Sequence, residues 1–311
     1  MTAAVLRPTA LVMAGAIDLT TLAEALPGWN VRHADALDGS EPVNDTTEIV
    51  VLRSGARLGA EQLQYFPALR HVIRAGSGLD GLDLPELARR GISVHRNPGP
   101  AAVSVAQWAL AAVLSLGRRI PLGQSALAAG VHFKAGCVTR PLAEARLAIW
   151  GAGPVGQACE VALAPHVGDI AYAARPSIPD GTRQLPASAL ADWADIHLVA
   201  LPATEENHGL FGADFLTAAR ERRPMLVCVG RLATLDVPAC LEALDDGDLA
   251  GLALDPVERE DVCLLPRGGP PRNFIATPHI GAQRTDVRAQ LDDWVGATAR
   301  TLVGRCEAAR P

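Results

Sequence analysis

Short apolar runs rich in β-branched residues alternate with helix-like stretches along the whole chain, and this alternation limits the possible folds more than any other feature. Each run has the length of a strand, and the stretches between the runs show helical spacing. Strands separated by helices form parallel sheets, because a parallel pair of strands needs a long crossover connection. The sequence therefore predicts an α/β fold built from doubly wound parallel sheets.

The expected strands fall into two series, which predicts two lobes. A chain of 311 residues fits two domains of about 150 residues each. A long apolar helix, expected at about residues 101–118, lies between the two series. The first series has strands at 9–14, 47–53, 70–75 and 92–96 and helices at 18–26, 59–66 and 83–90. The second has strands at 146–151, 169–174, 195–201, 224–229, 250–254 and 273–276, and the last helix is expected at about 284–303.

Composition argues against several classes of protein. The formal net charge is -6 and the basic residues are scattered, so we expect no nucleic-acid partner. No apolar run reaches the roughly 18 residues of a membrane helix, and the N-terminus lacks the pattern of a signal peptide. We therefore expect a cytoplasmic protein without a membrane partner. The six cysteines show no CxxC spacing, which favours reduced thiols over a disulfide framework or a metal site.

A glycine-rich segment, Gly151-Ala152-Gly153-Pro154-Val155-Gly156, follows the expected strand at 146–151 and precedes an expected helix. Its GxGxxG spacing allows a tight turn and lets the backbone approach a pyrophosphate, which then lies at the helix N-terminus. A GxGxxG sequence alone is a weak signal. The flanking strand and helix favour a dinucleotide-binding loop over a chance glycine turn.

The end of the next expected strand bears on the choice between NAD and NADP. A site for NAD usually has Asp or Glu about 20 residues after the glycine loop, where the carboxylate accepts from the ribose hydroxyls. Here the strand leads into Ala174-Arg175-Pro176-Ser177, without an acid. Arg175 can pair with a 2′-phosphate and Ser177 can hydrogen-bond it, so NADP is favoured over NAD. In the alternative, Arg175 lies along the adenine and NAD is accepted as well.

Three side chains at the ends of expected strands indicate acid/base chemistry. His279 follows the strand at 273–276, Glu260 follows the strand at 250–254, and Arg231 follows the strand at 224–229. A carboxylate bonded to one imidazole nitrogen fixes the tautomer, and the other nitrogen can take a proton from a hydroxyl. Arg231 offers two parallel donors to a carboxylate. We expect Glu260 to be the partner of His279, and its rival Glu258 to be a surface charge.

Two segments of the first lobe are candidates for substrate binding. Ser77 and Gly78 lie in a glycine-rich strand exit, Arg74–Asp80, whose N–H groups could form a nest for a carboxylate. Arg53 ends another strand and could add a cation. Ligands of open α/β sheets bind at the carboxyl ends of strands, where both segments lie. A plain turn is the alternative at each place.

These motifs resemble the D-isomer-specific 2-hydroxyacid dehydrogenases, and most of all their phosphoglycerate dehydrogenase branch, over about residues 47–285. The motifs that carry the resemblance occur in the family's order: Arg53-Ser54, Arg74–Asp80, Gly91-Ile92-Ser93-Val94, Gly151–Gly156, Arg231, Leu254-Asp255, Glu260 and Thr277-Pro278-His279-Ile280-Gly281. The resemblance implies two Rossmann-like lobes. A flavodoxin-like substrate-binding lobe would comprise residues 1–98 and 284–311, and a dinucleotide-binding lobe residues 99–283. It also implies a homodimer.

The resemblance further implies roles for individual residues. Arg231 would bind the substrate carboxylate and polarise its carbonyl, with His279 as the acid/base and Glu260 as its partner. Arg53, Ser77 and Gly78 would complete the substrate site, with no metal. The residues expected at the cofactor are Gly151, Gly153, Pro154, Val155, Gly156, Arg175, Ser177, Leu201, Pro202, Val229, Asp255 and Gly281. Among these, Asp255 would contact the nicotinamide carboxamide.

Several positions depart from the family's pattern. Cys228 replaces the usual Asn, Leu232 replaces a Gly, and Gln107 replaces a Glu. Pro256 and Asp261 interrupt the usual pattern around Glu260. The chemistry survives these changes, but the substrate does not follow from the most similar branch.

We therefore expect an NAD(P)-dependent oxidoreductase that transfers a hydride between nicotinamide and a small 2-hydroxy or 2-oxo acid, including acids that carry phosphate or phosphonate. A second interpretation keeps the fold but oxidises a hydrated aldehyde or phosphite, with His279 activating water or a hydrate hydroxyl. A third is a dinucleotide-sensing protein similar to the corepressors that share this fold. Turnover across a panel of 2-oxo acids distinguishes the enzyme from the sensor.

Overall fold

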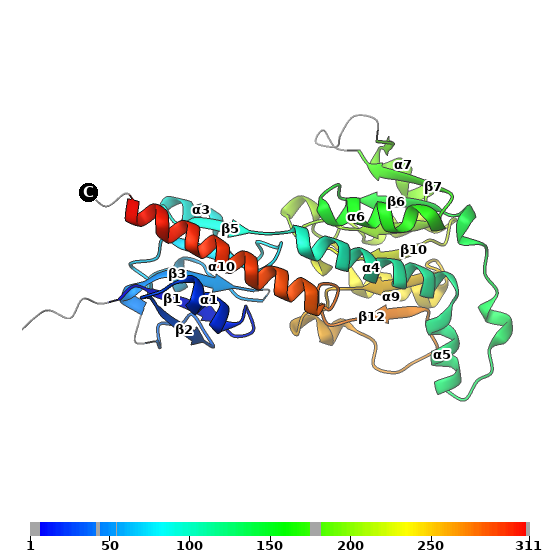
Figure 1. Ribbon diagram of the computed structural model, residues 1–311. Helices are drawn as coiled ribbons and strands as arrows, with labels where there is room; N and C mark the ends of the chain where they lie inside the picture. Colours follow the sequence, from blue (N-terminus) through cyan, green and yellow to red (C-terminus); the bar gives the residue numbers. More distant parts are fainter. Residues whose placement is uncertain (1–6, 42–43, 54, 175–181, 309–311) are drawn as a thin grey trace, which may run out of the picture. The chain divides into compact units, whose positions relative to one another are not determined.

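The structure is a computed structural model that describes residues 7–41, 44–53, 55–174 and 182–308. The chain divides into two compact units, each built around one parallel sheet (Figure 1). The first unit runs to Ala101 and resumes at Arg284, and the second runs from Ala102 to Gln283. The predicted α/β architecture with two doubly wound parallel sheets is confirmed.

The sheet of the first unit has the strand order β2-β1-β3-β4-β5, and all neighbouring strands are parallel. This is the flavodoxin-like order that the sequence predicted. Its strands are β1 (Thr9–Met13), β2 (Asn30–Ala34), β3 (Thr47–Leu52), β4 (His71–Arg74) and β5 (Ser93–Arg96). Its helices are α1 (Leu19–Ala25), α2 (Ala60–Leu63), α3 (Leu84–Arg89) and α10 (Thr285–Ala308), with one 3₁₀ turn, η1 (Asn44–Thr46).

Strand β3 separates two hydrophobic layers in this unit, because successive side chains of a strand point to opposite faces. Ile49 and Val51 pack in the layer that α1 and α10 cover, and Val50 and Leu52 pack in the layer that contains side chains of α2 and α3. All four side chains are fully buried. Val295 of α10 lies in the first of these layers, so the C-terminal helix is part of the core of the first unit.

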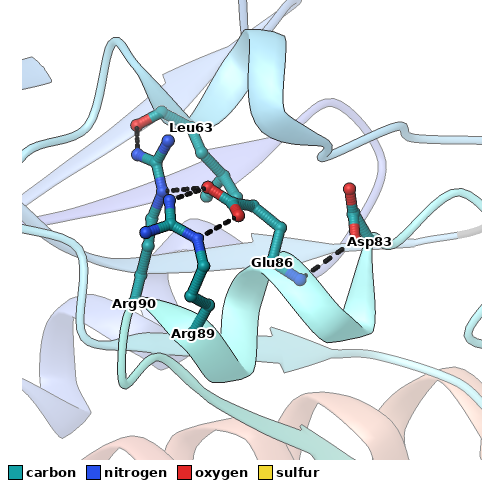
Figure 2. Close-up of polar contacts among 5 residues, drawn as sticks. All are labelled: Leu63, Asp83, Glu86, Arg89 and Arg90. Atoms are coloured by element: carbon teal, nitrogen blue, oxygen red, sulfur yellow. Dashed lines mark hydrogen bonds and ion pairs between the residues drawn. The ribbon is translucent and has the colours of Figure 1, made fainter.

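A network of charged side chains ties α3 to α2 (Figure 2). Asp83 caps α3 by accepting from the backbone N–H of Glu86 at 3.0 Å. The Glu86 carboxylate accepts from Arg89 Nε and from Arg90 Nε, both at 2.7 Å. Hydrogen bonds from Arg89 and then Arg90 lower the pKa of Glu86 from 4.5 to about 2. Arg90 Nη1 also donates to the carbonyl of Leu63 at 2.7 Å, which joins the two helices.

The sheet of the second unit has the order β12-β11-β10-β9-β6-β7-β8, again parallel throughout. Its strands are β6 (Arg146–Trp150), β7 (Asp169–Ala173), β8 (Gln184–Leu185), β9 (Ile196–Val199), β10 (Met225–Cys228), β11 (Gly251–Leu254) and β12 (Phe274–Ala276). Its helices are α4 (Gly99–Gly117, whose first residues belong to the first unit), α5 (Ile120–Ala128), α6 (Pro154–Leu163), α7 (Ala187–Trp193), α8 (Ala213–Ala219) and α9 (Val237–Asp246). Its 3₁₀ turns are η2 (Lys134–Cys137), η3 (Leu142–Glu144), η4 (Ala164–His166), η5 (Glu205–Asn207), η6 (Leu232–Thr234) and η7 (Glu260–Leu264).

Helix α4 covers one face of this second sheet. Its buried residues Ala109, Val113 and Leu116 pack with Leu147 and Ile149 of β6. The helix has the length and the apolar composition of a membrane span. Its buried face nevertheless contributes directly to the core of the second unit, as expected for the central helix of an α/β lobe.

The second sheet reverses its winding at β6. From this strand the chain adds β7 and β8 on one side and β9 to β12 on the other. Loops at such a reversal diverge at the carboxyl ends of the strands and leave room for a ligand. The loop that follows β6 is the GxGxxG segment, so the predicted dinucleotide loop lies at the point where sheets of this kind generally bind ligands.

Candidate active site

The glycine loop after β6 has the backbone geometry of a dinucleotide-binding turn. Gly151 has a φ of 111°, and a Cβ on it would lie 2.6 Å from the carbonyl oxygen of Ala200. A Cβ on Gly156 would lie 1.9 Å from the carbonyl oxygen of Gly151, so α6 approaches the loop as closely as only glycine allows. Gly153 caps α6 and Pro154 is its first residue. The unpaired N–H groups of the first helical turn can therefore receive a pyrophosphate.

The loops after β9 and β10 lie against one another beside this glycine loop. A Cβ on Gly230 would meet the carbonyl oxygen of Leu201 at 2.4 Å. Asn207 Nδ2 donates to the carbonyl of Pro202 at 3.1 Å and holds the loop after β9. Leu201 and Val229 are buried. The loops after β6, β9 and β10 thus pack against one another and form one continuous wall at this edge of the sheet.

The choice of nucleotide depends on the residues after β7. This strand ends at Ala173, and the next residue is the exposed Ala174. Because both residues are alanines, this strand end carries no acid. Arg175 and Ser177, the residues expected to bind a 2′-phosphate, lie outside the described residues. In the described parts of the chain, no three His, Cys, Asp or Glu side chains gather as metal ligands.

Arg231 is held through its backbone at the end of β10. Its carbonyl oxygen accepts from the hydroxyl of Thr234 at 2.7 Å, from the N–H of Thr234 at 3.1 Å and from the thiol of Cys228 at 3.7 Å. Burial raises the pKa of Cys228 to about 11, so the thiol keeps the proton that it donates. Arg231 Nη1 donates to the carbonyl of Gly230 at 2.7 Å. The cysteine at this unusual position therefore helps to fix the backbone of the arginine.

Asp255, at the end of β11, organises the loop that carries His279. Its buried carboxylate accepts from the hydroxyl of Thr277 at 2.6 Å and from the N–H groups of Ile280 at 2.8 Å and Gly281 at 2.9 Å. These donors lie on both sides of His279, whose φ of 53° is uncommon for a residue other than glycine. Such a conformation persists where the surrounding contacts fix it. The predicted contact of Asp255 with a nicotinamide stays a prediction.

Ser104 of α4 completes the support of this loop, and our sequence interpretation did not single it out. Its hydroxyl donates to the carbonyl of Gly281 at 2.6 Å, and its side chain is buried. Asp255 holds the N–H of the same glycine, so Gly281 is fixed on both sides. A buried serine on the apolar face of a helix must find a polar partner. That requirement is the signal that could have identified Ser104.

Glu258 is the carboxylate that binds His279, which corrects the predicted pairing with Glu260. His279 Nδ1 lies 2.6 Å from Glu258 Oε1. Glu260 is exposed and begins the 3₁₀ turn η7, where the chain changes direction. A carboxylate can only accept, so Nδ1 carries the hydrogen and Nε2 is left to exchange a proton. Glu258 and Glu260 are only two residues apart, so the sequence alone could not show which carboxylate reaches the imidazole.

In the first unit, two arginines hold the carbonyl groups of the Ser77-Gly78 loop. Arg96 Nη1 donates to the Ser77 carbonyl and Arg74 Nε donates to the Gly78 carbonyl, both at 2.8 Å. In a trans peptide the N–H points opposite to the carbonyl. The N–H groups of Gly78 and Leu79 are therefore directed away from the arginines. This arrangement suits the predicted nest for an anion.

Arg53 lies at the end of β3, where the sheet of the first unit reverses its winding between β1 and β3. Its Nη1 lies 3.5 Å from the carbonyl oxygen of Gly15 in the loop after β1. Burial lowers the pKa of Arg53, and the nearby charge of Arg288 lowers it further, while Asp292 opposes this shift. A half-buried cation at this point of the sheet suits an anionic ligand.

A cavity of about 570 Å³ lies in the second unit beside η6, α9 and η7. Leu232 and Leu264 contribute apolar walls, and Asp261 contributes a polar one. Arg231, His279 and the glycine loop do not line this cavity. It is therefore distinct from the wall formed by the loops after β6, β9 and β10.

Comparisons with known proteins identify the family of this chain. The family model described as "D-isomer specific 2-hydroxyacid dehydrogenase, NAD binding domain" matches residues 110–281. A D-3-phosphoglycerate dehydrogenase of Bacillus subtilis is 28% identical over 266 residues, or 83% of this chain, and the chain spans 50% of the length of that protein. A glyoxylate/hydroxypyruvate reductase B of Erwinia tasmaniensis is 29% identical over 280 residues, which cover 83% of both chains.

Solved structures show the same fold. D-lactate dehydrogenase from Aquifex aeolicus, complexed with NAD and lactic acid, gives a TM-score of 0.82 at 20% identity over 95% of both chains. An NADPH-dependent glyoxylate/hydroxypyruvate reductase from Sinorhizobium meliloti, in complex with NADP and malonate, gives 0.75 at 25% identity over 94% of this chain and 92% of that one. The family model covers more than half of the chain, and the motif-based resemblance is confirmed. The chain belongs to the D-isomer-specific 2-hydroxyacid dehydrogenase family of NAD(P)-dependent oxidoreductases.

Proposed function

We propose that this protein interconverts a small 2-oxo acid and its 2-hydroxy acid, with His279 as the acid/base. The observation that carries the proposal is the 2.6 Å contact between His279 Nδ1 and Glu258 Oε1 in the same unit as the glycine loop. A carboxylate-bound imidazole supplies or removes the hydroxyl proton, and a nicotinamide, when bound, supplies or accepts the hydride. The names of the relatives, which include reductases of glyoxylate and hydroxypyruvate, support this class of substrate.

The remaining residues of the second unit position the reaction in this proposal. Arg231 binds the substrate carboxylate through its guanidinium fork and polarises the adjacent carbonyl. Glu258 holds the tautomer of His279 in which Nε2 faces the proton to be moved. Asp255 keeps His279 in its left-handed backbone conformation through the three hydrogen bonds to the loop.

Three residues of the first unit are further candidates for anion binding in this proposal. The N–H groups directed away from Arg74 and Arg96 form a candidate nest for a carboxylate, and Ser77 and Gly78 belong to that nest. Arg53 adds a positive charge, which also allows substrates that carry a phosphate or phosphonate. Malonate bound to the Sinorhizobium meliloti reductase is a small dianion of this general kind.

NADP is the cofactor that we propose, with NAD as the weaker one. The end of β7 carries no acid for the ribose hydroxyls, and Arg175 and Ser177 follow it in the sequence. The NADPH-dependent relative supports this choice. Replacement of Arg175 by Ala is expected to lower the ratio of kcat/KM for NADPH over NADH. An unchanged ratio would rule out phosphate binding by this arginine.

The activity is tested with the full chain and a panel of 2-oxo acids, by following the absorbance of reduced nicotinamide with both cofactors. The expected result is turnover of a small 2-oxo acid, reduced roughly 10²–10⁴-fold in His279→Ala. Turnover of only a hydrated aldehyde or of phosphite would favour the second interpretation of the sequence. Tight NADPH binding without turnover of any compound would favour the dinucleotide sensor.

We also propose a homodimer that forms through α5 and the segment after it. Large apolar side chains are exposed here, namely Ile120, Leu127, Val131, Phe133 and Val138. A run of exposed apolar residues marks an interaction surface, and identical chains most often pair with twofold symmetry. The double substitution Leu127→Asp and Val138→Asp is expected to give a monomer in light scattering. A dimeric double variant contradicts this surface.

A reducing, cytoplasmic location completes the proposal. Cys137, Cys159, Cys228, Cys240 and Cys263 are free, and three of them, Cys159, Cys228 and Cys240, are buried. Free thiols persist where glutathione and thioredoxin keep them reduced.

A further inference from the structure

Glu258 and Asp261 are joined by two reciprocal hydrogen bonds. The N–H of Glu258 donates to Asp261 Oδ2 at 3.1 Å. The N–H of Asp261 donates to the carbonyl of Glu258, also at 3.1 Å. The three-residue separation closes a small ring around the backbone of the segment that leads into η7. Asp261 thereby fixes the backbone of the residue that binds His279.

The other side of the same segment is fixed by the loop that carries His279. The N–H of Val257 donates to the carbonyl of Thr277 at 3.1 Å. Glu258 therefore lies between two restraints, one from the β12 exit and one from Asp261. Its carboxylate reaches His279 Nδ1 at 2.6 Å, while Glu260 is exposed. Both restraints act on the backbone of the segment, and the side chain that contacts the imidazole is that of Glu258.

We propose that Asp261 is a positioning residue that selects Glu258 as the partner of His279. The inference rests on the function proposed above, because it concerns the same acid/base pair. Without an acceptor at position 261, the N–H of Glu258 loses its partner and the segment before η7 can turn differently. The carboxylate of Glu258 would then sample positions away from the imidazole, and His279 would lose the contact that fixes its tautomer.

A pair of substitutions separates the acceptor from the charge at this position. Asp261→Asn keeps an oxygen that accepts from the N–H of Glu258, and Asp261→Ala removes it. We expect Asp261→Ala to lower kcat by roughly 10- to 100-fold, as for a catalytic group displaced by about 1 Å. Asp261→Asn is expected to stay within about threefold of the wild type. Asp214→Ala, a substitution at an exposed acid of α8, is the matched control.

Coupling to Glu258 shows whether Asp261 acts through this residue. In a Glu258→Gln background the additional effect of Asp261→Ala should largely disappear, because the contact that it positions is already impaired. If the double variant instead loses kcat by the product of the two single losses, the two residues act independently, and the proposal is overturned. Equal losses in Asp261→Ala and Asp261→Asn would overturn it too, since the acceptor would then not matter.

The tautomer of His279 provides a readout that does not depend on activity. In ¹⁵N NMR spectra of the neutral ring, the wild type and Asp261→Asn should show the Nδ1–H form that donates to Glu258. Asp261→Ala should shift the ring towards the Nε2–H form. If the protein turns over no 2-oxo acid but the tautomer still shifts, the proposed function fails and the positioning role stands. An unchanged tautomer in Asp261→Ala overturns the positioning role itself.

Discussion

At the scale of single residues, the site depends on which acid of a short loop faces the imidazole. Asp255, Glu258 and Asp261 each accept a hydrogen bond that shapes the His279 region, and Glu260 lies exposed. Asp255 fixes the loop of the histidine, Asp261 fixes the loop of the glutamate, and Glu258 joins the two. Removing the acceptor oxygens of any one of these three side chains should therefore affect the chemistry, each through a different contact.

The pairing of His279 predicts opposite results for the two glutamates. Glu258→Gln is expected to lower kcat/KM for 2-oxo acid reduction at least about tenfold, because a neutral amide stabilises a protonated imidazole less well. Glu260→Gln is expected to stay within about twofold of the wild type, because its side chain is exposed and Glu258 holds the contact with the histidine. Steady-state kinetics of both variants test this. A larger loss in Glu260→Gln would restore the pairing expected from the sequence.

Cys228 should be chemically inert in the folded protein. Its side chain is fully buried and burial raises its pKa to about 11, so the thiol stays protonated at neutral pH. Iodoacetamide at pH 8 should modify the exposed Cys263 and should leave Cys228 unmodified until the protein unfolds. Mass spectrometry of the labelled peptides measures this. Labelling of both cysteines at equal rates in the native protein would contradict the burial.

At the scale of elements, the network at α3 should make the stability of the first unit depend on acid pH. The pKa of Glu86 falls from 4.5 in the unfolded chain to about 2 in the folded protein. A lowered folded-state pKa stabilises the protein above pH 4.5, and the contribution is lost as the pH falls towards 2. Glu86→Gln should therefore lower the melting temperature at pH 7. The difference from the wild type should shrink between pH 4.5 and 2, and a constant difference would argue against the ion pairs.

The elements that the sequence predicted share a continuous apolar pattern, and those it missed lack one. β3 and β4 are central strands with buried Val and Ile, and both were expected. β2 was missed because it is an edge strand with exposed Arg32 and His33 at its centre. β8 was missed because it has only two residues at the opposite edge of the second sheet. Edge strands are half-solvated, so hydrophobic periodicity identifies them poorly.

In the candidate site, the sequence pattern predicted where residues lie but not which side chains contact one another. The strand ends that carry Arg231, Asp255 and His279 were predictable, because parallel strands bring their carboxyl ends to one edge. The acid that pairs with His279 was not predictable from spacing. The conformation of the loop before η7 decides it, and that conformation depends on hydrogen bonds between Glu258 and Asp261. Ser104 was missed because its partner, Gly281, lies 177 residues away in the sequence.

At the scale of the whole molecule, two units with separate cores should unfold in separate steps. The cores of the first unit contain side chains of α10, and those of the second unit contain side chains of α4. Units with their own cores behave as domains, and multidomain proteins deviate from a single two-state transition. Differential scanning calorimetry should therefore resolve two transitions. Glu86→Gln assigns them, because it should lower only the transition of the first unit.

Cofactor binding should then raise only the other transition. The glycine loop and the wall beside it lie entirely within the second unit, so a dinucleotide stabilises this unit by mass action. At a concentration 100 times Kd the stabilisation is about 2.7 kcal/mol, which corresponds to roughly 5–10 °C for a unit of this size. NADPH should give a larger shift than NADH at equal concentration. Equal shifts with both nucleotides would remove the preference for NADP. A shift confined to the first unit would instead contradict the placement of the dinucleotide on the glycine loop.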